Sequence, residues 1–170
     1  MTPGARPAFS GPRLAVPAAI AVAIVGFVIL SAVAGSPSSE RGANRAAAVA
    51  LRTTKLGRIL VNGDGRTLYL FLEDTGPRST CYGGCARVWP PATVEGKPRA
   101  GAGLVARKLQ TTKRRDTPLE QMVYNGHPLY TADADVKPGD ANGQGFFGTW
   151  FVVSGSGKQI GKAAKGAGGY

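Results

Sequence analysis

Residues 58–74, RILVNGDGRTLYLFLED, decide the fold, because their pattern returns 61 positions later as residues 119–135, LEQMVYNGHPLYTADAD. The shift needs no gap, and it superimposes identical residues: Gly65 on Gly126, Leu68 on Leu129, Tyr69 on Tyr130, Asp74 on Asp135 and Trp89 on Trp150. A gapless register of this length indicates a duplicated unit. We place the two repeats at about 58–97 and 119–158.

Both copies have the pattern of a β-hairpin. In the first, residues 59–61 and 67–72 flank the turn NGDG, whose glycines allow positive φ. In the second, residues 122–124 and 129–130 flank Asn125 and Gly126. Apolar residues fall on both faces of 67–72, so this strand should be covered on both sides. We therefore expect a mainly β, small single domain of two related β-hairpin repeats.

The composition changes along the chain and predicts five segments. Residues 1–13 are a basic N-terminal segment, residues 14–34 are continuously apolar, and residues 35–55 resemble a linker. The duplicated β domain is expected over 56–154. Residues 155–170 contain little that could be buried and predict a disordered tail.

Residues 14–34 carry no charge and are long enough to span a bilayer as a helix. Two interpretations compete. A transmembrane anchor would keep the protein in the cell membrane with its domain on the extracytoplasmic side. A signal segment would be cleaved near Ala34 and the protein secreted. The apolar run is longer than the core of a signal segment, and this favours the anchor.

The chain is strongly basic, with a net charge of +11. Such a charge attracts anionic surfaces, so anionic lipid and cell-wall polymer are candidate partners beside the membrane itself. The sequence contains no nucleic-acid-binding motif, and we expect no nucleic-acid partner. It gives no indication of a protein partner. The densest basic run, residues 107–115, is interpreted as a solvated loop or sheet edge.

Cys81 and Cys85 are the only cysteines, and two glycines lie between them. Outside the cytoplasm a pair this close favours a small-loop disulfide. A metal or haem site and an exchanging redox pair are the alternatives. A metal site would need further ligands, and His127, the only histidine, is a weak candidate. His127 follows a predicted turn, where a polar residue is typically at the surface.

No catalytic set stands out, because the chain lacks G-x-S-x-G, a P-loop and a G-x-G-x-x-G following a strand. We therefore expect neither an enzyme nor a cofactor. The acidic cluster of residues 133–142 is better explained by turn chemistry than by calcium binding.

Several linked motifs resemble one known family. They are Tyr69-x-Phe71-x-x-Asp74, Cys81-x-x-x-Cys85-x-x-x-Trp89-Pro90-Pro91, the run from Val123 to Tyr130, the glycine-rich residues 139–145, and Trp150. Together they are similar to the bacterial secreted-repeat family of predicted lipoproteins with a Tyr-x-(Phe/Trp/Tyr)-x-x-Asp motif. The resemblance implies an extracytoplasmic, membrane-associated protein and marks Tyr69, Phe71, Asp74, Trp89, Tyr130, Asp135 and Trp150 as motif residues. It implies no activity, because the repeat is of unknown function.

Two departures from the family pattern matter. Ala132 stands where the second copy should have an aromatic residue, and no cysteine directly follows 14–34 for lipid attachment. The favoured function is a non-catalytic binding or envelope-structural module. The alternatives are an accessory protein for metal, haem or electron transfer, and an enzyme of unrecognised type.

Overall fold

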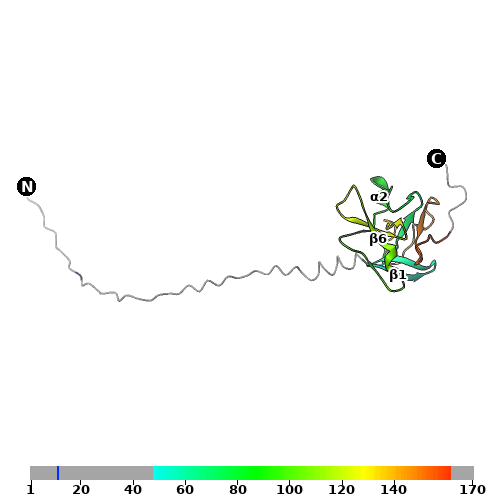
Figure 1. Cartoon of the computed structure of the whole chain (residues 1–170), viewed down its shortest axis with the longest axis horizontal. Coiled ribbons are helices and arrows are strands. Elements are labelled where there is room, and N and C mark those ends of the chain that lie inside the picture. The colour runs from blue at the N-terminus through cyan, green and yellow to red at the C-terminus, as the bar shows by residue number, and fades with distance from the viewer. Residues whose placement is uncertain (1–10, 12–47, 162–170) are drawn as a thin grey trace, which may run out of the picture. The chain divides into compact units, whose positions relative to one another are not determined.

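The structure is a computed structural model that describes Gly11 and residues 48–161 (Figure 1). Its elements are β1 (Ala48–Thr54), β2 (Gly57–Asn62), β3 (Tyr69–Phe71), α2 (Gly84–Val88), β4 (Thr93–Val94), β5 (Arg99–Ala100), the 3-10 helix η1 (Ala106–Lys108), β6 (Leu109–Lys113), β7 (Glu120–Tyr124), β8 (His127–Pro128) and β9 (Trp150–Val152). They form three small sheets, β2-β1-β5, β3-β9 and β4-β7-β6, with β8 paired to β7. The predicted mainly β fold is confirmed.

The duplication is visible in the strand register. In the β1–β2 hairpin Leu51 pairs with Leu60, and in the β6–β7 hairpin Thr112 pairs with Gln121. The second pair of residues follows the first by 61 positions in both strands. The two hairpins are therefore the same element in the two repeats, and each repeat begins with its own long hairpin.

The two repeats exchange their later strands. Strand β3 of the first repeat pairs with β9 of the second, so that Tyr69 lies opposite Val152. In the equivalent position of the other half, Tyr130 bridges Pro91. Tyr69 and Tyr130 also exchange backbone N–H···O=C bonds of 2.8 and 3.0 Å with each other. Because each repeat completes the sheet of the other, neither half is closed by itself.

The exchanged ladders differ in length for a local reason. Trp150, Phe151 and Val152 form the regular strand β9, whereas the equivalent residues of the first repeat are Trp89, Pro90 and Pro91. Proline has no backbone N–H, so this segment cannot donate a continuous ladder. Pro90 O still accepts the N–H of Thr131 at 2.9 Å, and the extended geometry is kept without a named strand.

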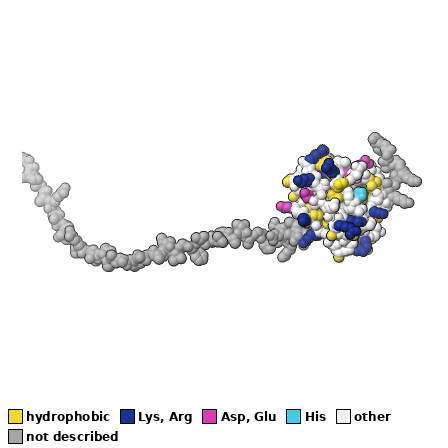
Figure 2. All heavy atoms as spheres, in the orientation of Figure 1, with side chains coloured by type: hydrophobic (Ala, Val, Ile, Leu, Met, Phe, Trp, Pro, Cys, Tyr) yellow, Lys and Arg dark blue, Asp and Glu magenta, His cyan; other side chains and the backbone are white. Residues whose placement is uncertain are grey.

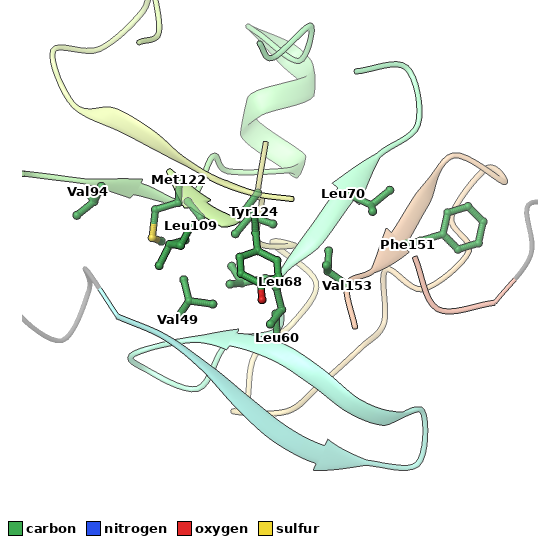
Figure 3. Packing of buried hydrophobic residues seen from close by; sticks show 12 residues of the cluster. Val49, Leu60, Leu68, Leu70, Val94, Leu109, Met122, Tyr124, Phe151 and Val153 are labelled. Atoms are coloured by element: carbon green, nitrogen blue, oxygen red, sulfur yellow. The ribbon is translucent and has the colours of Figure 1, made fainter. Parts of the chain in front are cut away.

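Residues 68–71, which include β3, lie between two hydrophobic clusters. Leu68 and Leu70 point into one, which is mostly aliphatic and lies between the β1–β2 hairpin and β6–β7 (Figure 3). Tyr69 and Phe71 belong to the other, which contains the tryptophans. This confirms that apolar residues on both faces of the segment are covered. Leu72 departs from the pattern because it lies beyond the strand and is 37% exposed.

Two predicted boundaries are wrong. Residues 48–55 are not linker, because β1 pairs with β2 along its whole length and buries Val49. Its sequence, AVALRTT, lacks the regular alternation of apolar and polar residues that predicts a strand. Residues 155–161 are not a disordered tail: Ile160 donates its N–H to Val152 O at 2.8 Å and packs against the aromatic cluster.

Among residues 48–161 there is no helix long and apolar enough to cross a membrane. The predicted anchor or signal segment at 14–34 lies outside the described residues, as do most of the predicted linker and the end of the predicted tail.

Candidate functional site

The seven motif residues come together in the centre of the domain, and six of them are nearly inaccessible to solvent. The Tyr69 hydroxyl donates to Asp135 Oδ2 at 2.7 Å, and the Tyr130 hydroxyl donates to Asp74 Oδ2 at 2.6 Å. Each tyrosine thus bonds the aspartate of the other repeat. Both tyrosines are 0% exposed, and the two aspartates are 4% exposed or less. The Tyr-x-x-x-x-Asp spacing therefore serves to join the two repeats.

The buried carboxylates have further donors. Asp74 Oδ1 accepts the N–H and the hydroxyl of Thr80, both at 2.7 Å, and Asp135 Oδ1 accepts the N–H of Asn142 at 2.8 Å. Burial, followed by the bond to the carboxylate, raises the pKa of both tyrosine hydroxyls well above their usual value. Each hydroxyl therefore stays protonated as a donor, and its carboxylate serves as the acceptor.

Three aromatic rings stack beside the tyrosines. Trp89 and Trp150, one from each repeat, are nearly parallel with centroids 4.0 Å apart, and Phe71 stacks on Trp150 at 4.2 Å. Tyr69 meets Trp89 edge-on at 5.3 Å. The second repeat has Ala132 where the first has Phe71, and Ala132 is buried in the same cluster. The missing aromatic therefore shortens an internal stack and removes no surface group.

Cys81 and Cys85 form a disulfide, with Cα atoms 5.3 Å apart, and this confirms the pairing expected from their spacing. The half-cystines pack against the aromatic cluster, and the single-turn helix α2 leads from Cys85 to Trp89. The N–H of Trp89 donates to Cys85 O at 2.8 Å. The bonded loop thus places Trp89 beside the strand that carries Tyr69.

The disulfide loop is also held by Arg114, which lies just after β6. Its guanidinium donates to Cys81 O at 3.0 Å, to Ser79 Oγ at 2.9 Å and to Asp116 at 2.7 and 2.8 Å. Residues 109–113 of the basic run form the edge strand β6, in agreement with a sheet edge, but Arg114 is only 7% exposed. It ties the second repeat to the loop of the first.

The candidate metal ligands are not brought together. His127 is half-buried on β8, next to the predicted turn. Asp140 Oδ2 accepts the backbone N–H groups of Val136 and Lys137, which is the turn chemistry expected of this cluster. Within the described part of the chain, no three His, Cys, Asp or Glu side chains lie close enough to hold a metal ion.

A feature that the sequence did not reveal is a hollow of about 650 Å³ between β1 and residues 138–144. Arg52 and Lys55 line one side, and Pro138, Gly139 and Asp140 line the other. A second hollow, of about 360 Å³, adjoins it at Arg52 and Pro138. The sequence pattern assigns residues 35–55, which include Arg52, to a linker. It therefore gives no reason to expect the arginine in a cleft.

Comparison with known families identifies the repeat. A family model described as a secreted repeat of unknown function matches residues 50–93 and 111–154. The two matched segments begin 61 positions apart, as the self-similarity of the sequence requires. Both start eight residues before the predicted repeat, because β1 and β6 are part of the unit. No curated protein and no solved structure matches the chain.

Proposed function

The chain belongs to the family of secreted repeats of unknown function, and from this premise we propose that it is a non-catalytic module of the cell envelope that binds an anionic polymer. A secreted location agrees with the Cys81–Cys85 disulfide, because such bonds persist in oxidising compartments. The motif residues support a non-catalytic role. Their hydroxyls and carboxylates are buried and bonded to one another, so they cannot reach a substrate.

The surface charge is the observation that carries the proposal. Residues 48–161 contain 15 Lys and Arg against nine Asp and Glu, a net charge of +6. Two of these acids, Asp74 and Asp135, are buried. Lys and Arg side chains accordingly outnumber Asp and Glu on the visible face of the domain (Figure 2). A surface of this kind draws polyanions and holds them by forces that salt screens.

Binding to synthetic polyanions tests this function. The full chain, purified in a neutral detergent, is titrated with polyphosphate and with neutral dextran of similar length. We expect binding to polyphosphate alone, weakening steadily as salt is raised. Replacing the exposed Lys97 and Lys113 with Glu should weaken it further, whereas the matched Lys→Arg changes should preserve it. The absence of binding at about 10 mM salt, where the Debye length is about 30 Å, would refute the proposal.

We further propose that residues 14–34 anchor the domain to the membrane. The length and uniform apolarity of the segment support an uncleaved span. Mass spectrometry of the chain from its native envelope fraction tests this, because an anchored chain keeps residues 14–34. A mature N-terminus at Gly35 would show that the segment is a cleaved signal and overturn the anchor.

A further inference from the structure

We propose that Arg52 is the anion-binding group of a groove formed by the two adjoining hollows, which takes phosphate or carboxylate groups of a linear polymer. The inference rests on the proposed function and assigns it a site. The groove runs past Arg52 and Pro138, the residues that both hollows share. Their volumes, about 650 and 360 Å³, are in the range of ligand sites.

The Arg52 side chain is exposed on one side and lies against two glycines on the other. It lies over Gly65 and Gly139, which belong to turns from opposite halves of the domain. A Cβ atom at Gly65 would lie 2.9 Å from Arg52 Nη2, and one at Gly139 would lie 3.2 Å from Arg52 Cδ. The N–H of Gly139 donates to Gly65 O at 3.0 Å and joins the two turns beneath the arginine. The glycines thus make a floor on which the side chain rests.

The donors of Arg52 are unused. Its side chain forms no hydrogen bond or ion pair with any other residue in 48–161, although it lies over the glycine floor. A guanidinium carries five N–H donors in a planar fork, and the fork matches the oxygens of a phosphate or carboxylate. Lys55, exposed on the same side of the larger hollow, adds a second positive charge.

Two acidic groups line the groove, and neither forms an ion pair with Arg52. Asp140 lines the larger hollow, but its Oδ2 accepts the N–H groups of Val136 and Lys137 at 3.1 and 2.7 Å. Asp64 lines only the smaller hollow. Neither carboxylate lies within 4 Å of the Arg52 guanidinium. Arg52 and Lys55 carry two positive charges against the one negative charge of Asp140, so the lining of the larger hollow keeps a net positive charge.

The shape of the site favours a linear polymer as the ligand over the flat surface of a bilayer. A polymer segment can follow two adjoining hollows and present a charged group to Arg52 between them, whereas the head groups of a flat bilayer meet a concave site poorly. We therefore assign the groove to a linear polyanion, and vesicles of anionic lipid serve as the competing arm of the test.

The test compares two arginines of the same hairpin. Arg52→Gln removes the groove cation, and Arg58→Gln removes an exposed cation that lines neither hollow and reaches toward Gly103 instead. Both variants lower the net charge by one. Affinities of the full chain for polyphosphate, polygalacturonate and anionic vesicles are measured at one ionic strength, and thermal unfolding verifies that each variant is folded.

We expect Arg52→Gln to lose about tenfold in affinity for at least one polymer, as when a charge-assisted hydrogen bond is removed. Arg58→Gln should lose no more than about threefold, the effect of one screened surface charge. The polymer that shows the larger loss identifies phosphate or carboxylate as the ligand. Arg52→Lys, which keeps the charge without the fork, should fall between wild type and Arg52→Gln.

Three results would overturn the inference. Equal losses in the two variants would leave the proposed function intact but make binding diffuse over the basic surface. A loss confined to vesicles would assign Arg52 to lipid. If wild type binds no polymer at low salt, the proposed function itself fails, and the site fails with it. An unfolded Arg52→Gln variant is replaced by Lys55→Gln, whose side chain lines the same hollow.

Discussion

Removing one hydroxyl from the centre of the domain should weaken both repeats together. The change is Tyr69→Phe, which keeps the ring against Trp89 and deletes only the oxygen. That oxygen donates to Asp135 at 2.7 Å and accepts the N–H of Gly143 at 3.3 Å. Because Asp135 belongs to the second repeat, the lost bond is one that holds the two halves together.

The magnitude follows from the groups left behind. Asp135 is 1% exposed and retains a single donor of those described, the N–H of Asn142 at 2.8 Å. A hydrogen bond to a charged group contributes about 1.5–3 kcal/mol. A buried carboxylate that loses one donor cannot replace it with water, so the whole of this contribution is lost. We expect the free energy of unfolding to fall by about 2–3 kcal/mol. Tyr130→Phe leaves Asp74 two donors from Thr80, but it also removes the 2.7 Å bond between the Tyr130 hydroxyl and Ser79 Oγ, so we expect a comparable loss.

Urea unfolding followed by tryptophan fluorescence measures this loss, since Trp89 and Trp150 stack on each other in the core that joins the two repeats. Because the repeats complete each other, we expect one cooperative transition with a lower midpoint and an unchanged slope. A double-mutant cycle with Asp135→Asn isolates the pair, and its coupling energy should exceed about 1 kcal/mol.

The matched control is Tyr82→Phe, because the Tyr82 hydroxyl has no hydrogen-bond partner among the described residues and its half-buried ring lies against the guanidinium groups of Arg114 and Arg115. Its effect should stay within about 0.5 kcal/mol. If Tyr69→Phe and Asp135→Asn act additively, the bond contributes nothing and the reasoning is wrong. If the unfolding curve shows two separate transitions, the repeats are independent and the exchanged strands do not couple them.

Three further predictions concern the same core. Burial raises the pKa of Tyr69 and Tyr130, so their contribution to the free energy of unfolding should be full below pH 10 and should decline as the pH rises further. The double Tyr→Phe variant should lose this decline above pH 10. Identical dependence of stability on pH in the variant and the wild type would refute the prediction. Replacing Cys81 and Cys85 with Ser should cost about 2 kcal/mol, the entropy of a short loop, and mass spectrometry of unreduced protein finding two free thiols would disprove the disulfide. Gly143→Ala places a Cβ 2.5 Å from the Trp89 ring and should cost several kcal/mol in urea unfolding, whereas Gly76→Ala, with open space around it, should be neutral.

The local sequence was sufficient to predict the elements whose turn residues have distinct backbone preferences. Asn125 and Gly126 adopt positive φ between β7 and β8, as the hairpin pattern predicted. The cysteine spacing predicted the disulfide for a similar reason, because three intervening residues that include two glycines allow the chain to close a tight loop. The sequence did not predict β1, and it predicted the region of β6 only as a solvated loop or a sheet edge. Both strands owe their conformation to pairing with β2 and β7.

The sequence by itself determined that the domain is a duplication, where its two copies lie, and which residues recur in both. A repeat shift is a property of the chain order, so it needs no coordinates. The sequence could not show that Tyr69 bonds Asp135 instead of the aspartate of its own repeat, or that Arg52 rests on glycines from both halves. These contacts join positions far apart in the chain, and only the exchange of strands between repeats brings them together. The tertiary structure therefore decided that the motif is the buried link between two halves and that the exposed cleft is elsewhere.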